Sequence, residues 1–94
     1  MLTINRLIWD TWNVAHIARH HVTPEEVEEV CHGQPVTSRT YKGRLRVVGP
    51  TRRRRLLAVI LAPTQDEGVY YPVTARPADR KERRIYQHHR GTQP

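Results

Sequence analysis

The chain of 94 residues contains no phenylalanine and a single cysteine, Cys31. Without phenylalanine, the core must be built from Val, Leu, Ile and Ala together with two Trp and four Tyr. A single cysteine excludes an intramolecular disulfide and is typical of a reducing compartment. No N-terminal run resembles a signal peptide, and no apolar stretch is long enough to span a membrane. We therefore expect one cytoplasmic domain, residues 1–94, with residues 90–94 as a flexible tail and no contact with a membrane.

Lysine is also scarce, because only Lys42 and Lys81 accompany the arginines. Lys and Arg total 16 against 9 Asp and Glu, which gives a net charge of +7. The planar guanidinium of Arg binds phosphate and carboxylate groups with two parallel hydrogen bonds. The composition therefore favours a polyanionic partner, either nucleic acid or an acidic protein. The alternative is a basic surface that only maintains solubility, but the charge is clustered rather than spread.

Two helices are predicted in the first third of the chain. Asp10 is a suitable N-cap for a helix over 11–20, in which Val14, Ile17 and Ala18 recur on one face. TPEE (23–26) predicts a second helix, because it is a capping box with proline at the first helical position. The preceding segment 4–9 fits either a short strand or an extended lead-in.

The spacing of apolar residues then changes to a period of two, which predicts strands. We expect strands at 36–41, 44–49, 56–62 and 69–75, joined by a tight turn at 42–43 and a basic turn at 50–55. The apolar run at 56–62 predicts the central strand, and Pro72 indicates an edge or a bulge.

A last helix is predicted over 78–89. Asp79 and Glu82 would cap it, and Ile85 would give it an inner face. Two helices, a sheet of about four antiparallel strands and a C-terminal helix make an α+β domain.

Five segments in this order resemble the BrnT-type toxins of bacterial toxin–antitoxin systems, within the RelE/ParE-like group of ribonucleases. They are LIWD (7–10), ARHHVTPEEVEEV (18–30), YKGRLRVVGPT (41–51), RLLAVIL (55–61) and TARPADRKERRIY (74–86). The sequence departs from the family at His21 and Arg54, where the family usually has glycine, and at Pro72, which interrupts a strand.

The resemblance implies the RelE/ParE-like fold and metal-independent cleavage of RNA, with no cofactor. It also implies a cognate antitoxin as protein partner, of the ribbon-helix-helix type, in a heterotetramer with the toxin; a homodimer is a further arrangement. Cleavage by a 2′-OH group needs a base, an acid and cations beside the phosphate.

Five residues are candidates for this chemistry. Arg76 would clamp the scissile phosphate where a strand meets a helix N-terminus, and the family resemblance makes Arg46 a second candidate. His20 has a side chain suited to proton transfer near neutral pH. Glu82 and Tyr86 share one flank of the last helix. The alternatives are structural: Arg76 paired with Asp79 or Glu82, Glu82 as a cap, and a packed Tyr86.

Five further arginines are candidates for RNA binding. Arg44 shares a strand face with Arg46, because side chains alternate along a strand. The run Arg52, Arg53 and Arg54 lies in a predicted turn, and Arg83 lies in the last helix. Such clusters grip phosphates without sequence specificity. His16 and His20 are four residues apart, but no third metal ligand accompanies them, so no metal site is predicted.

Two other functions remain open. The chain could be a non-catalytic module that binds nucleic acid or an antitoxin with a toxin-like fold. A ParE-like fold that acts on a protein target is the other alternative.

Overall fold

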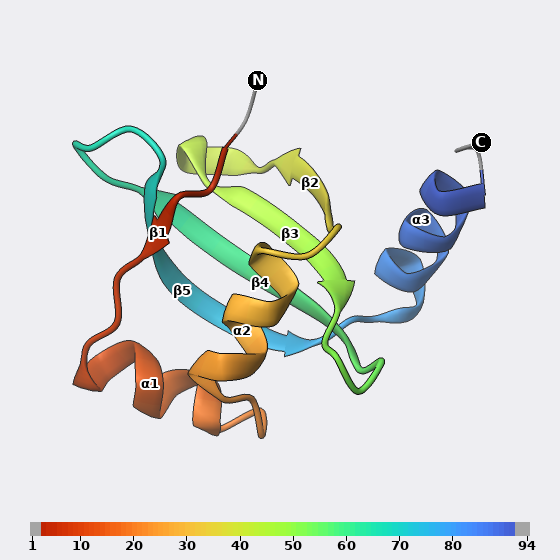
Figure 1. Ribbon diagram of the computed structural model, residues 1–94, viewed down its shortest axis with the longest axis horizontal. Helices are drawn as coiled ribbons and strands as arrows, with labels where there is room; N and C mark the ends of the chain where they lie inside the picture. The colour runs from red at the N-terminus through yellow and green to blue at the C-terminus, as the bar shows by residue number, and fades with distance from the viewer. Residues whose placement is uncertain (1–2, 92–94) are drawn as a thin grey trace.

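The computed structural model describes residues 3–91 and has an α+β fold (Figure 1). Its elements follow one another as β1 (Arg6–Leu7), α1 (Thr11–Ala18), α2 (Pro24–Cys31), β2 (Val36–Arg39), a 3₁₀ turn η1 (Tyr41–Gly43), β3 (Leu45–Pro50), β4 (Leu56–Pro63), β5 (Val69–Pro77) and α3 (Arg80–Gly91). The predicted fold class is confirmed, with helix and strand ends that differ by a few residues. Of the tail predicted at 90–94, residues 90 and 91 belong to α3, and residues 92–94 lie outside the described residues.

The sheet has five strands in the order β1-β5-β4-β3-β2. Strands β2 to β5 form the predicted antiparallel meander, with β4 in the centre. The fifth strand, β1, pairs in parallel with β5 through Arg6 and Leu7. The prediction of about four antiparallel strands did not count this parallel edge strand, although a short strand was one of the two interpretations of segment 4–9.

Pro72 lies at a bulge, which is one of the two interpretations given above for this proline. Ile60 pairs with Thr74 and Leu61 pairs with Pro72, so Val73 is the extra residue on β5. A bulge is where an interior strand tolerates proline, because the ladder is already interrupted there.

Helices α1 and α2 cover one face of the sheet (Figure 1). The core between them is aliphatic and consists mainly of Ile17, Val22, Val27, Val30, Cys31, Leu45, Val47, Leu57, Val59, Leu61 and Ala75. Burial, with the nearby charge of Glu28, raises the pKa of the Cys31 thiol to about 12. Cys31 is therefore a small buried apolar residue, as its place on α2 predicts.

The inner face of α1 differs from the prediction. Asn13 and Ile17 are buried, whereas Val14 is 37% exposed and Ala18 is exposed. The Asn13 side chain donates to the carbonyl oxygens of Ile8 at 2.9 Å and Pro72 at 3.2 Å, and its Oδ1 accepts from the Asp10 amide. These hydrogen bonds tie α1 to β5, so a polar residue and not the apolar periodicity orients this helix.

Helix α3 packs on the opposite face of the sheet, at one end. Ala78 and Tyr86 form a second, smaller cluster with Val48 and Ala58. Glu82 is also buried, and Ile85 is 43% exposed, so the predicted inner face of this helix was wrong. Residues 82 and 86 are four apart and therefore lie one above the other on the helix. The inner face of α3 is thus formed by the residues that the sequence marked as candidates for chemistry.

Candidate functional site

Arg46, Arg76 and Glu82 meet on the face of the sheet that α3 partly covers. The register of the sheet aligns three residues across adjacent strands: Val48 on β3, Ala58 on β4 and Arg76 on β5. Arg46 lies two residues before Val48 on β3 and pairs with Ile60. Paired residues point to the same face, so both guanidinium groups project toward α3. We call these three residues the Arg76–Glu82 cluster.

Glu82 is the centre of this cluster. Its carboxylate accepts from Arg76 Nη1 at 2.7 Å and Nη2 at 2.9 Å, and Arg46 Nη1 lies 3.9 Å away. The Glu82 side chain is only 3% exposed, whereas those of Arg46 and Arg76 are 37% exposed. Two arginines from different strands therefore share one buried carboxylate.

Glu82 also caps α3, as predicted. Its Oε1 accepts from the Asp79 amide at 2.9 Å, while the Asp79 carboxylate accepts from the Glu82 amide at 2.8 Å. This reciprocal pair satisfies backbone donors that a helix N-terminus leaves without partners. The same carboxylate thus starts the helix and holds Arg76.

These contacts set the charge states in the cluster. Burial by itself would raise the pKa of Glu82, but hydrogen bonds from Arg76 and the Asp79 amide outweigh it and lower that pKa below 4.5. The hydrogen bonds to Glu82 raise the pKa of Arg76. Glu82 is consequently a carboxylate at neutral pH, and a weak base.

Tyr86 lies one helical turn beyond Glu82 and is 6% exposed. It also lines a pocket of about 550 Å³ between α3 and the turn that joins β3 to β4. The pocket is lined by Pro50, Thr51, Arg52, Arg54, Leu56, Arg83, Tyr86 and Gln87. We call it the α3 pocket. It brings three of the five predicted RNA-binding arginines together with Tyr86.

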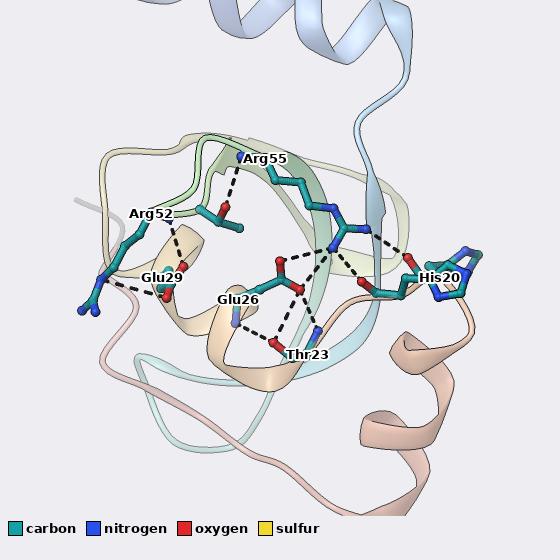
Figure 2. A network of polar contacts seen from close by, with 8 residues as sticks. His20, Thr23, Glu26, Glu29, Arg52 and Arg55 are labelled. Atoms are coloured by element: carbon teal, nitrogen blue, oxygen red, sulfur yellow. Dashed lines mark hydrogen bonds and ion pairs between the residues drawn. The ribbon is translucent and has the colours of Figure 1, made fainter.

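The arginines differ in how they meet this pocket. Arg83 Nε donates to the carbonyl oxygen of Ala78 at 3.1 Å, which folds the side chain back along α3. Arg52 turns toward α2 instead, with its Nε 4.0 Å from the Glu29 carboxylate (Figure 2). Arg53 is exposed in the same turn and does not line the pocket, and Arg44 lies just before β3, two residues from Arg46.

Among the described residues, no contact joins His20 to the Arg76–Glu82 cluster. Its ring lies edge-on to His16, with centroids 6.3 Å apart, and His16 stacks on Trp12 at 4.8 Å. Its carbonyl oxygen accepts from Arg55 Nη2 at 3.2 Å. His20 therefore belongs to the α1–α2 connection on the other side of the sheet.

Arg55 organises that connection (Figure 2). Its Nη1 donates to the carbonyl oxygen of His21 at 2.6 Å and lies 3.2 Å from both carboxylate oxygens of Glu26. Glu26 also caps α2 by accepting from the Thr23 amide at 3.0 Å. Arg55, which immediately precedes β4, thus joins the α1–α2 connection to α2 through one guanidinium group, and sequence spacing gave no signal of this role.

The residues missed at the site itself are Gln87 and the apolar pair Pro50 and Leu56. Gln87 is four residues after Arg83, so it shares a face of the predicted helix with that arginine. This spacing was a usable signal for Gln87. For Pro50 and Leu56, only the folded turn brings them against α3.

Two non-glycine residues have a left-handed backbone beside these sites. The φ angle is 60° at His21 and 67° at Arg54, in a range that favours glycine. Both residues therefore carry local strain that a glycine would relieve.

This strain gives a stability prediction. We expect His21→Gly and Arg54→Gly each to raise the free energy of unfolding by about 1 kcal/mol, because glycine adopts positive φ without a Cβ clash. Urea denaturation measures the change. The control is Arg53→Gly, in the same turn at an ordinary φ angle, which should not stabilise the protein. Equal effects at 53 and 54 would show that conformational strain is not the cause.

No protein-family model matches the sequence, and no curated protein matches it. Within residues 3–91, no helix is long and apolar enough to cross a membrane. Among the same residues, no three His, Cys, Asp or Glu side chains gather as metal ligands would.

Proposed function

We propose that this protein is a BrnT-like toxin of a toxin–antitoxin system and acts in the cytoplasm as a metal-independent endoribonuclease. The observation that carries the proposal is the convergence of Arg46 and Arg76 around Glu82 on one face of the sheet, next to the α3 pocket. The positive φ angles at His21 and Arg54, where the family pattern has glycine, support the resemblance.

The proposed reaction is attack of a ribose 2′-OH on the adjacent phosphorus. The P–O5′ bond breaks, which leaves a 2′,3′-cyclic phosphate and a 5′-OH; a base takes the 2′ proton and an acid supplies one to the 5′ oxygen. Arg76 and Arg46 would stabilise negative charge on the phosphoryl oxygens. Since Glu82 occupies both Nη atoms of Arg76, the phosphate would have to share or replace this contact.

Tyr86 is the proton-transfer candidate that the geometry favours. It lies one turn from Glu82 and lines the α3 pocket, whereas His20 lies in the α1–α2 connection. Glu82 is better suited to positioning Arg76 than to removing a proton, because its pKa is lowered.

A second candidate function is favoured by the same ion pair. In a non-catalytic module that binds RNA or an antitoxin, the Arg76–Glu82 pair would only anchor α3 to the sheet. Its bidentate geometry and the buried carboxylate are what such an anchor requires.

The deciding experiment is cleavage of labelled single-stranded RNA by the purified protein in EDTA. We expect the wild type to cut, and Arg76→Ala to cut about 100-fold more slowly or not at all, because removing one donor from a developing oxyanion has an effect of that order. Arg46→Gln is the companion variant, since its longer contact with Glu82 makes it less needed for folding. Arg39→Ala, an exposed arginine on β2, is the control and should cut within about twofold of wild type.

If the wild type binds free RNA without cutting it, cleavage should next be measured with RNA on ribosomes. If the wild type binds RNA and cuts it in neither setting, the ribonuclease proposal is wrong and the non-catalytic module stands.

A further inference from the structure

The α3 pocket lies beside the Arg76–Glu82 cluster but is formed by different side chains. One wall comes from the turn between β3 and β4, and the other from α3. Tyr86 lines the pocket and belongs to the small cluster beneath α3, and Leu56 lines the pocket and packs against that cluster. A volume of about 550 Å³ is within the range of small-ligand pockets.

Two of the three arginines that line the pocket, Arg54 and Arg83, are available to a ligand. Arg83 uses Nε for the Ala78 carbonyl, and no contact within the described residues engages its two Nη atoms. Arg54 is exposed, and its backbone amide is held by the Thr51 carbonyl at 2.9 Å. Two guanidinium groups from segments far apart in the chain therefore face one space, which suits a phosphate group.

The remaining lining has the character of a base-binding surface. Pro50 and Leu56 pair across the start of the turn and supply an apolar wall, and Tyr86 adds an aromatic edge. Gln87 is exposed and carries both a donor and an acceptor at the end of its side chain. RNA-binding proteins recognise unpaired bases with this combination of apolar or aromatic contact and amide hydrogen bonds.

We propose that the α3 pocket is a subsite for one nucleotide of single-stranded RNA. Arg54 and Arg83 hold its phosphate, Pro50 and Leu56 contact its base, and Gln87 reads the edge of the base. The subsite rests on the proposed RNA substrate and adds a sequence preference to it, because a glutamine amide distinguishes bases where phosphate contacts do not. A glutamine pairs best with adenine, which offers a donor and an acceptor side by side.

The test uses 2′-O-methyl RNA hexamers, which lack the attacking hydroxyl, so binding is measured without cleavage. Fluorescence anisotropy would follow fluorescein-labelled A6, C6 and U6 with the full chain. We expect A6 to bind most tightly and the double variant Arg54→Gln/Arg83→Gln to weaken binding about tenfold or more, as the loss of two phosphate contacts implies.

The matched control removes the same charge elsewhere. Arg6→Gln/Arg39→Gln changes two exposed arginines on the edge strands β1 and β2, outside the pocket lining. We expect no more than about a threefold loss from this control, through the general electrostatic contribution to binding. Equal losses in the two double variants would overturn the subsite, because binding would then follow net charge alone.

Gln87→Ala provides a second readout that does not depend on charge or on the fold. Gln87 is exposed and has no described structural contact, so we expect normal thermal stability and a smaller difference between A6 and U6. An unchanged preference would contradict the role of Gln87, and absence of wild-type binding would overturn both the subsite and the RNA substrate. If binding depends on the pocket but the protein does not cut RNA, the proposed subsite stands and only the proposed ribonuclease activity is wrong.

Discussion

Replacing Glu82 with glutamine should lower the melting temperature by about 8–16 °C, from a loss of about 2 kcal/mol at roughly 4–8 °C per kcal/mol for a domain of this size. The loss is smaller than the roughly 3–5 kcal/mol of a fully buried ion pair, because the Arg76 side chain is 37% exposed. In the wild type, both carboxylate oxygens of Glu82 accept hydrogen bonds from Arg76. In the variant, an amide NH₂ group replaces one of these oxygens, so two donors face each other there. Differential scanning calorimetry measures the change, with Glu25→Gln, an exposed acidic residue on α2, as the control.

The effect should depend on pH in a defined direction. The pKa of Glu82 is lower in the folded protein than its ordinary value of 4.5. Its contribution to stability is therefore complete above that value and is lost as the pH falls through the lowered pKa. The difference between wild type and Glu82→Gln should be largest near neutral pH and should shrink below about pH 4. A difference that stays constant with pH would show that the lost charge is not the cause.

The same variant tests what Glu82 does for RNA. A general base at position 82 would produce the acidic limb of the pH–rate profile, and Glu82→Gln would abolish it. We expect the limb to remain, with a slower rate, because Glu82 positions Arg76 rather than accepting a proton. Loss of the limb at a temperature where the variant is folded would assign the base to Glu82.

Replacing Asn13 with alanine should lower the melting temperature by about 12 °C or more, which corresponds to a loss of about 3 kcal/mol or more at roughly 4 °C per kcal/mol. The variant leaves the carbonyl oxygens of Ile8 and Pro72 and the Asp10 amide without their partner, and each orphaned group costs about 1–3 kcal/mol. The side chain is fully buried, so water cannot replace it freely. Asn5→Ala, at an exposed asparagine, is the control and should change the melting temperature by only a few degrees.

Asn13→Asp should be worse than Asn13→Ala at neutral pH. It keeps the shape of the side chain but places a carboxylate against two carbonyl oxygens in the core. The pKa of this new group would be raised in the folded state, so its penalty should diminish as the pH falls. Thermal melts at two pH values would show partial recovery in acid for Asn13→Asp and none for Asn13→Ala. The absence of such recovery would mean that the asparagine amide is not in contact with these carbonyls.

The sequence predicted the elements whose signals are local. The capping boxes at Asp10, Thr23 and Asp79 place the start of each helix, because capping is decided within four residues. The alternation of apolar residues likewise identified the four strands of the meander. Of the two interpretations of Pro72, an edge or a bulge, the bulge is confirmed.

What the sequence could not predict depends on contacts between distant segments. A strand of two residues such as β1 has no periodicity, and its parallel partner lies more than 60 residues away. The sequence gives no sign that Asn13 is a core residue, because its partners are backbone atoms, one of them 59 residues further along. For the candidate site, spacing grouped Glu82 with Tyr86 correctly. Contacts between distant segments bring Arg46 close to Glu82 and place His20 away from both residues, and spacing does not reveal such contacts.

The order in which the chain is synthesised determines when the Arg76–Glu82 cluster can form. A ribosome releases the N-terminus first, so β1 and α1 emerge before β5, the strand to which both are bound. Helix α3, which closes the Arg76–Glu82 cluster and the α3 pocket, is made after all five strands of the described sheet. A nascent chain that has made β5 but still lacks α3 therefore contains the whole described sheet and neither site.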